Sequence, residues 1–280
     1  PPFLYMDINK LDKIAEACSI NPLESVEYPP VAISKGEKLI KAKSGDSLLP
    51  IPIGTYGNFS FIQAPPKTKK TFFVSLLAGV YLSGTNNFSA DLKGHRGKKR
   101  ILHIDTEQGV FHASKSFKRA IDMSGVKDSY DTFGLRSIFY KERIEFIEYM
   151  LFQESYGLVI IDGIADLVSD VNNIEESNNC VQKLMEWTST YNCHIITVIH
   201  SNFGSDKPTG HLGSFLEKKT ETQIQLETNT VNKDWITVKC KRSRGYSFET
   251  FSFEINDLGL PQIVGDLYDI LDEKNNATPF

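Results

Sequence analysis

The sequence predicts an α/β fold in which helices flank a mainly parallel sheet. Short, almost entirely apolar runs at residues 100–105, 157–162 and 193–200 are typical of strands that are buried on both faces. Stretches of helical length separate these runs, and such alternation of strands and helices favours parallel pairing. Toward the carboxyl terminus the pattern changes to consecutive strands with short turns, which predicts an antiparallel extension of the same sheet.

The elements follow one another from residue 53 onward, after an N-terminal arm. We expect residues 1–52 to be an appendage with a short helix at 11–18, followed by extended chain, because prolines interrupt it. Residues 53–280 are expected to form one domain. Its parallel strands are expected at 58–64, 100–105, 157–162 and 193–200. Its helices are expected at 71–82, 110–123, 144–153 and 179–190. Its antiparallel strands are expected at 221–226, 235–241 and 248–255.

The composition is typical of a globular chain and excludes several classes of protein. Of 280 residues, 40% are hydrophobic and 24% charged, and the formal net charge is −4. This charge excludes a histone-like polybasic protein, but not a nucleic-acid enzyme with a local basic surface. The four scattered cysteines form no C-x-x-C pair, so we expect reduced thiols, no zinc site and a cytoplasmic location. The longest apolar stretch falls far short of the roughly 20 residues of a membrane helix, so no membrane partner is expected.

The loop after the first strand reads A-P-P-K-T-K-K-T over residues 64–71. A P-loop, G-x-x-x-x-G-K-[ST], lies between a strand and a helix, and here Lys70 and Thr71 occupy its lysine and hydroxyl positions. Such a loop surrounds phosphates with backbone N–H groups at a helix N-terminus. Ala64 and Lys69 replace the two glycines, and a non-glycine residue in the left-handed conformation costs roughly 1–2 kcal/mol. The alternative interpretation is a lysine-rich, solvated turn.

Three further polar residues end or follow the apolar strands, at the edge where open α/β sheets bind ligands. Asp162 closes the run L-V-I-I-D, where a carboxylate serves a Mg²⁺ ion, although Asp-Gly is also a common turn pair. Glu107 follows the second strand and is favoured over Asp105 as the group that orients water, although either residue could cap the next helix. His200 ends the last parallel strand and is expected to sense a γ-phosphate, unless a neighbouring loop satisfies it.

Together these features resemble the RecA-like ATPases, and more closely the hexameric replicative helicases and the RepA-type plasmid replication helicases, over about residues 57–255. The loop is similar to the family's G-A-P-G-T-G-K-T, with Lys67 at a third glycine position. The resemblance implies ATP and Mg²⁺ as cofactors. It implies that Asp162 and Thr71 hold Mg²⁺ and that Glu107 and His200 act at the γ-phosphate. The residues implied to bind the nucleotide are Pro66, Lys67, Thr68, Lys69, Lys70 and Thr71.

The segment K-C-K-R-S-R-G at 239–245 is similar to the family's K-x-R-x-G strand end, which supplies cationic fingers to the ATP of the neighbouring subunit. Alignment on Gly245 puts Ser243 at the arginine position, so Arg242 or Arg244 is implied to substitute. The alternative is a basic strand end at the surface.

The resemblance also implies partners. It implies a ring or filament of copies of the chain, with a hexamer expected, and single-stranded DNA bound by central loops at 165–178 and 201–212. The first loop is acidic, whereas the second holds Lys207 and His211. Another basic run, at 93–100, is expected to be a solvated loop, with a DNA or partner surface as the alternative.

Three functions therefore remain open. The first is an ATPase acting on DNA, as a replication or mobilisation helicase of a plasmid, phage or mobile element. The second is a non-catalytic RecA-like nucleic-acid-binding or scaffold protein, which the altered loop motivates. The third is an ATPase acting on proteins, like the KaiC group, which the acidic net charge and the acidic first loop motivate.

Overall fold

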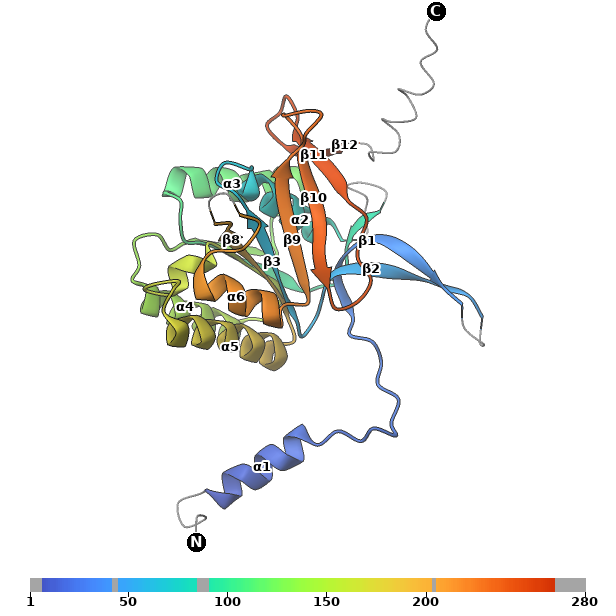
Figure 1. The fold of residues 1–280 in the computed structure, drawn as a ribbon, viewed down its shortest axis with the longest axis vertical. Coiled ribbons are helices and arrows are strands. Elements are labelled where there is room, and N and C mark those ends of the chain that lie inside the picture. Colours follow the sequence, from blue (N-terminus) through green and yellow to red (C-terminus); the bar gives the residue numbers. More distant parts are fainter. Residues whose placement is uncertain (1–6, 42–44, 85–90, 203–204, 265–280) are drawn as a thin grey trace, which may run out of the picture.

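The computed structural model describes residues 7–41, 45–84, 91–202 and 205–264 (Figure 1). Its centre is a nine-stranded sheet with the strand order β12-β11-β10-β9-β3-β8-β7-β5-β6. The strands are β3 (Phe59–Ala64), β5 (Arg100–Asp105), β6 (Tyr130–Gly134), β7 (Tyr156–Asp162), β8 (His194–His200), β9 (Thr222–Thr228), β10 (Ile236–Ser243), β11 (Phe251–Ile255) and β12 (Pro261–Val264).

The pairing directions confirm the predicted fold class. The strands from β9 to β6 in this order pair in parallel, whereas β9, β10, β11 and β12 pair antiparallel. All side chains of β7 are buried, as expected of an apolar strand in the middle of a sheet that is covered on both faces.

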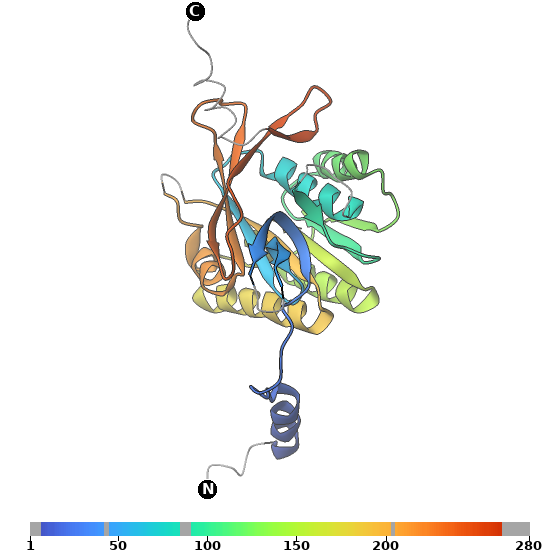
Figure 2. The ribbon, with the colours of Figure 1, turned by 90° about the vertical axis from the view of Figure 1, so that its right-hand side faces the viewer.

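Helices cover both faces of the parallel part of the sheet (Figures 1 and 2). One face carries α2 (Lys70–Ser83) and α3 (Val110–Ser124), and α2 is buried from Phe73 to Leu82. The opposite face carries α4 (Tyr140–Gln153), α5 (Ile174–Tyr191) and α6 (Gly210–Lys219), together with the 3₁₀ helix η1 (Ile164–Leu167). The sheet thus separates two apolar cores.

The N-terminal part divides into an isolated helix and a hairpin. Helix α1 (Ile8–Cys18) has no buried residue and lies away from the sheet (Figure 2). Strands β1 (Val31–Ile40) and β2 (Ser47–Thr55) pair antiparallel, and with β4 (Leu92–Gly94) they form a second, three-stranded sheet. Ala32, Ile33 and Ile53 of this hairpin are buried in the core around α2. These contacts favour placing residues 31–55 with the large domain; the predicted boundary at residue 53 stays a prediction.

The connections of β3 and β8 define where a ligand fits. From β3 the chain passes through α2 and β4 to β5, beyond β8 in the sheet order, whereas from β8 it passes through α6 to β9, on the other side of β3. Two neighbouring parallel strands therefore send their chains in opposite directions and onto opposite faces. In open α/β sheets, this divergence opens a crevice outside the carboxyl ends of the strands, where ligands bind.

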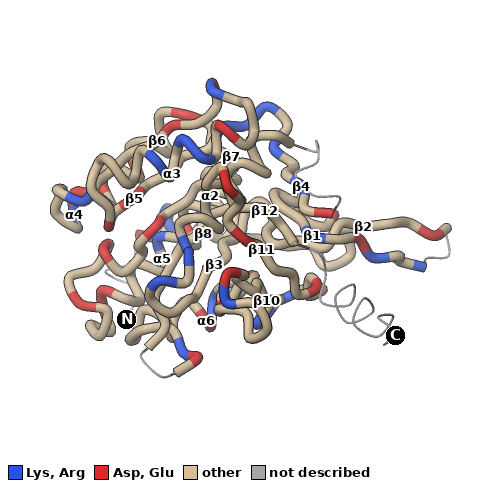
Figure 3. Tube along the Cα trace, turned by 90° about the horizontal axis from the view of Figure 1, so that it is seen from above, with Lys and Arg blue, Asp and Glu red and all other residues tan. Residues whose placement is uncertain are grey.

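Within the described part of the chain, no helix combines the length and apolar character needed to cross a bilayer. Basic and acidic positions are interspersed over the molecule (Figure 3), in keeping with the small net charge.

Candidate functional site

The loop between β3 and α2 holds two lysines in the left-handed region of backbone space. Lys67 has φ of 66° and Lys69 has φ of 55°. These are two of the positions at which the resembling family has glycine. Each left-handed lysine costs about 1–2 kcal/mol relative to ordinary backbone. The side chain of Thr68 is buried and donates to the Pro65 carbonyl at 2.7 Å, and Lys69 Nζ donates to the Asp234 carbonyl at 2.9 Å. These bonds hold the loop in a conformation that glycine would adopt without strain.

Lys70 connects this loop to the end of β8. Its Nζ lies 3.0 Å from His200 Nδ1 and 3.3 Å from the Pro65 carbonyl oxygen. The strand register explains the contact, because Ala64 pairs with His200 across β3 and β8. An ammonium group only donates, so Nδ1 of His200 accepts and its proton lies on Nε2. Nε2 is 3.7 Å from Glu107 Oε1, so lysine, histidine and glutamate form one chain of contacts.

The charges of this chain influence one another. Partial burial lowers the pKa of Lys70, and the carboxylates of Glu107 and Asp162 oppose that change. His200 lowers the pKa of Glu107, with a smaller contribution from Lys70, so Glu107 carries a negative charge at neutral pH. The site therefore links a cationic lysine to an anionic glutamate through the imidazole of His200 at the sheet edge.

Asp162 ends β7 below this contact and is almost fully buried. Within the described residues its Oδ2 has no hydrogen-bond partner. Burial raises the pKa of Asp162 to about 7, with further contributions from the carboxylates of Asp105 and Glu107, while Lys70 and the Thr71 hydroxyl oppose the rise. A buried carboxylate oxygen without a donor is costly unless a ligand or ion satisfies it.

Asp105 and Glu107, between which the sequence left a choice, have different surroundings. Asp105 Oδ1 accepts the backbone N–H groups of Glu107 and Gln108 at 3.0 and 2.8 Å, and its Oδ2 accepts Gln108 Nε2 at 2.9 Å. Its carboxylate thus shapes the turn after β5. Glu107 instead contacts His200. Gln108 also donates to Thr71 Oγ1 at 3.3 Å, which links the turn to α2.

A cleft of about 390 Å³ opens over these residues. Pro66 and Thr68 belong to the loop but do not line the cleft, and the buried Asp162 does not line it either. The sequence did not single out Phe72, Gln108, His112 or Arg119, which line its remaining wall. Gln108 lies in the turn before α3, and the other three lie in helices whose pattern carried no motif. The lining residues are Lys67, Lys69, Lys70, Thr71, Phe72, Glu107, Gln108, His112, Arg119 and His200.

Arg242 and Arg244 lie at the other edge of the sheet. Strand β10 runs antiparallel to β9, with Ile236 opposite Thr228 and Ser243 opposite Thr222. The carboxyl end of β10 is therefore at the amino ends of the parallel strands. Arg244 Nη2 donates to the Lys219 carbonyl at 2.6 Å, and Arg242 is exposed. Within one chain, the structure does not bring these arginines to the cleft.

A Mg²⁺ site made of protein ligands alone is absent from the described residues, which contain no group of three or more His, Cys, Asp or Glu suited to a metal. Mg²⁺ in nucleotide sites uses few protein ligands and completes its shell with phosphate and water oxygens. Thr71 Oγ1 and the unpartnered Oδ2 of Asp162 fit that requirement, because both are oxygen atoms near the lysine-rich loop.

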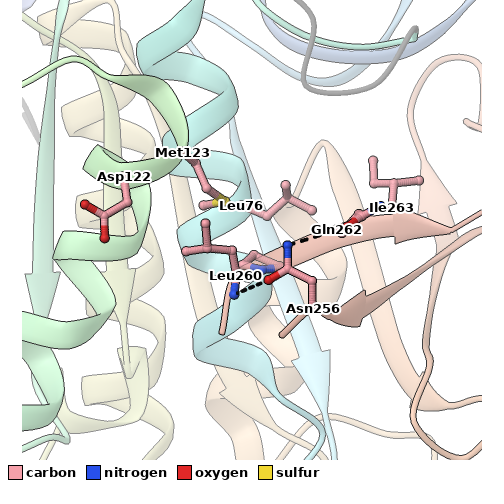
Figure 4. Close-up of a pocket in the computed structure, with 8 residues that line it drawn as sticks. Leu76, Asp122, Met123, Asn256, Leu260, Gln262 and Ile263 are labelled. Atoms are coloured by element: carbon pink, nitrogen blue, oxygen red, sulfur yellow. Dashed lines mark hydrogen bonds between the residues drawn. The ribbon is translucent and has the colours of Figure 1, made fainter. Parts of the chain in front are cut away.

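A second cleft, of about 280 Å³, lies between α2, the end of α3 and the β11–β12 hairpin (Figure 4). Leu76, Met123 and Ile263 give it an apolar wall, and Asn256 bonds within the hairpin. None of the residues that the sequence predicted for the site lines it.

The regions expected to contact DNA differ in their charges. In the acidic stretch 165–178, Asp166 accepts the Thr106 hydroxyl and Glu176 accepts the Ser169 hydroxyl, so these carboxylates bond within the fold. Lys207 and His211 are exposed; part of the loop 201–212 lies outside the described residues. In the basic run 93–100, Lys93, Lys99 and Arg100 all contact groups of this chain, which favours the solvated loop over a nucleic-acid surface.

Comparison with known proteins supports this part of the fold. No curated protein sequence matches the chain. A sequence model of the AAA domain matches residues 50–206, more than half of the 280 residues. The match covers the strands β3, β5, β7 and β8, whose carboxyl ends carry the cleft. The chain therefore belongs to the AAA-domain family of P-loop NTPases.

Proposed function

We propose that the chain is an ATP-binding, RecA-like ATPase that acts on DNA, as a replication or mobilisation helicase of a mobile element. One observation carries the proposal. Lys70, Thr71, Glu107 and His200 follow or end β3, β5 and β8 and line one cleft at one sheet edge, and the buried Asp162 at the end of β7 interacts with Lys70 and Glu107. The cleft holds three lysines and one arginine against the single exposed carboxylate of Glu107, so it favours a polyanion.

In this proposal the loop binds the triphosphate. The backbone N–H groups of residues 67–71 surround phosphate oxygens at the start of α2, where the helix dipole adds positive charge. Lys70, which contacts only neutral acceptors in the described chain, has an ammonium available for β- and γ-phosphate oxygens. Thr71 and Asp162 hold Mg²⁺. When bound, Mg²⁺ neutralises the charge that develops on the phosphates.

Glu107 and His200 act on the reacting end of the nucleotide. Glu107 is ionised and at the mouth of the cleft, so its carboxylate orients a water and accepts its proton. His200 bridges Lys70 and Glu107, so a change at the γ-phosphate alters a contact that begins the loop 201–212. This loop is one of the two proposed to contact single-stranded DNA.

Neither Arg242 nor Arg244 lies near the cleft of its own chain. In this proposal one of them therefore acts on the nucleotide bound by a neighbouring copy. This role requires an oligomer, and we propose a hexameric ring with single-stranded DNA at its centre.

A second function, an ATPase acting on proteins, is favoured by the acidic stretch 165–178. Asp170 and Glu175 are exposed there, and like-charged loops repel a nucleic-acid backbone. The two functions share the cleft and differ in the partner. A non-catalytic nucleic-acid-binding or scaffold protein shares neither the tight MgATP binding nor the turnover.

The test measures MgATP binding by calorimetry and ATP hydrolysis with and without single-stranded DNA. We expect Lys70→Ala to abolish Mg²⁺-dependent binding and hydrolysis, whereas Lys98→Ala, an exposed lysine outside the cleft, leaves both unchanged. Binding of an oligonucleotide that weakens steeply with salt supports the DNA role. An ATPase that ignores DNA at every salt concentration supports the protein-directed alternative. Wild-type protein that never hydrolyses ATP contradicts both catalytic functions.

A further inference from the structure

An arginine stacked on a phenylalanine forms the wall of the cleft that no part of the proposed phosphate site uses. The guanidinium carbon of Arg119, on α3, lies 3.8 Å from the centre of the Phe72 ring, on α2. Both side chains line the same cleft as Lys70 and Thr71. The Phe72 ring therefore supports one face of a planar cation at the edge of a ligand-sized space.

Arg119 differs from Lys69 and Lys70, the other partly buried cations of the cleft, because those lysines donate hydrogen bonds and Arg119 donates none to a described residue. In the described part of the chain, its guanidinium makes no hydrogen bond and no ion pair, although it has five N–H donors. Burial lowers the pKa of Arg119, and no neighbouring carboxylate opposes that change. Such a group is stabilised by a ligand that offers a π face or an acceptor.

The position of Arg119 along α3 separates it from the reacting end of the cleft. Helix α3 begins at Val110, close after Glu107, and Arg119 lies nine residues later, about 14 Å along the axis at 1.5 Å per residue. Phe72 directly follows Thr71 on α2. In the proposed site the γ-phosphate lies near Glu107 and the loop 67–71 holds the phosphate chain. The wall made by Arg119 and Phe72 is then left for the nucleoside part of the bound nucleotide.

We propose that the guanidinium of Arg119, supported by the ring of Phe72, is the platform on which the base of the bound nucleotide stacks. The proposal rests on the proposed nucleotide site and names the part of it that holds the base. Guanidinium planes stack on aromatic rings and on nucleobases, and such stacking is tolerant because every base has a π face. The platform therefore contributes affinity for ATP and GTP alike and little discrimination between them.

The test compares three ligands on the full chain: MgATP, MgGTP and magnesium tripolyphosphate, which has no base. We expect Arg119→Ala to raise the Kd for MgATP and MgGTP about tenfold, the scale of one stacked base, and to leave the Kd for tripolyphosphate unchanged. Arg119→Lys keeps the positive charge but replaces the planar guanidinium with an ammonium group, so we expect it to behave like the alanine variant. Lys118→Ala is the matched control, because Lys118 is the preceding residue and, among the described residues, its one ion pair is with exposed Asp122 on the same helix.

Each contrary result has its own meaning. Rescue by Arg119→Lys, or an equal loss of tripolyphosphate binding, shows that Arg119 contacts phosphate and overturns the base platform. Unchanged MgATP binding in both Arg119 variants also overturns it while leaving the nucleotide site intact. Wild-type protein that binds none of the three ligands refutes the proposed function itself. Should Arg119→Ala unfold, Phe72→Leu tests the same platform, since it keeps the apolar contact and removes the ring.

Discussion

Lys67 and Lys69 show how the loop proposed to bind phosphate keeps its path without glycine. Both lysines have positive φ, and the loop is held by the Thr68 hydroxyl and the Lys69 ammonium on backbone carbonyls. Glycine is favoured at such positions because it lacks a Cβ, but the penalty for lysine is only about 1–2 kcal/mol per residue, which a domain of this size tolerates. The replacement also adds cationic side chains to the cleft.

The backbone strain at Lys67 predicts an order of stability among substitutions. The side chain of Lys67 is exposed and makes no hydrogen bond or ion pair with the described residues, so substitutions there report mainly on the backbone. We expect Lys67→Gly to raise the free energy of unfolding by about 0.5–1 kcal/mol. This is the backbone strain that glycine relieves in the folded state, minus the conformational entropy that glycine adds to the unfolded chain. Lys67→Val should lower it by about 1–2 kcal/mol, because a β-branched residue tolerates positive φ least. Urea denaturation measures both, and a valine variant more stable than the glycine variant contradicts the assignment.

His103, in the middle of β5, predicts how stability depends on pH. It is fully buried, its Nδ1 contacts the Tyr130 hydroxyl at 2.6 Å, and burial lowers its pKa to about 3. Below its ordinary pKa of about 6.5 the unfolded chain binds a proton that the folded chain excludes, so this contribution to stability is complete above that pH and is lost as the pH falls.

Between pH 8 and pH 5 the loss from His103 amounts to about 2 kcal/mol. We expect His103→Gln to be less stable at pH 8 but to lose correspondingly less stability on acidification, in urea titrations at both pH values. His112→Gln is the control, because that imidazole is already exposed to solvent in the fold. An unchanged pH dependence in His103→Gln refutes the assigned proton linkage.

The sequence could predict the residues whose position follows from strand ends, and it could not predict those that reach the site through helix packing. Asp162 and His200 end apolar strands, and the shared edge of parallel strands brought them to the loop. Phe72 and Arg119 face the cleft because α2 packs on α3, and nothing in a helical pattern states which neighbour will face which residue. Glu107, which the sequence favoured over Asp105 as the group that orients water, contacts His200 at the cleft, whereas Asp105 bonds within its own turn; the role of Glu107 stays a prediction.

At the scale of elements, the hairpin of β1 and β2 was the part of the fold least visible in the sequence. Pro50 and Pro52 interrupt β2, which is an edge strand, and edge strands tolerate proline because one side of the backbone needs no partner. The polar alternation of β1 reads as solvated chain, yet Lys35 is buried there and pairs with Asp91. Helix α6 was also missed, since its two glycines suggest a loop; Gly213 instead allows close packing on Pro208.

Gly94 predicts how tightly this hairpin is joined to the domain. Strand β4 lies so close to α2 that a Cβ at Gly94 would stand 2.5 Å from both Tyr81 Cα and the Val80 carbonyl oxygen. Because both obstacles are backbone atoms, Gly94→Ala must move β4, and with it β1, away from the helix. We expect a loss of about 1–3 kcal/mol in the free energy of unfolding.

The matched control for that substitution is Gly134→Ala in β6, where no atom lies within 4 Å of the new Cβ. It should change stability by no more than about 0.5 kcal/mol. Equal stability of the two variants in thermal or urea unfolding would show that β4 is free to shift, contrary to the packing described above.

At the scale of the whole molecule, the two edges of the sheet carry different parts of the proposed machinery. The cleft occupies the carboxyl edge of the parallel strands, and the loop before β10 touches it through the bond from Lys69 to Asp234. Arg242 lies six residues beyond Ile236, about 20 Å away at 3.3 Å per residue. A chain of this shape cannot place its own Arg242 on its own nucleotide, so a catalytic role for either arginine demands a head-to-tail contact between copies.

This separation predicts complementation between two inactive variants. The Lys70→Ala variant lacks the lysine proposed to bind phosphate but keeps both arginines. The Arg242→Ala/Arg244→Ala variant keeps Lys70 but loses the arginine proposed to act on the neighbouring copy. We expect it to hydrolyse ATP at least on the order of 10³-fold more slowly than the wild type. In an equal mixture with random assembly, roughly a quarter of the head-to-tail interfaces join an intact lysine site to intact arginines. We therefore expect the mixture to regain about that fraction of the wild-type rate, measured as phosphate release, while the triple variant carrying all three changes adds nothing. Size-exclusion chromatography must first show that the oligomers exchange subunits. If the mixture is then as inactive as its components, Arg242 and Arg244 have no role in the catalytic site and are a basic strand end on the surface.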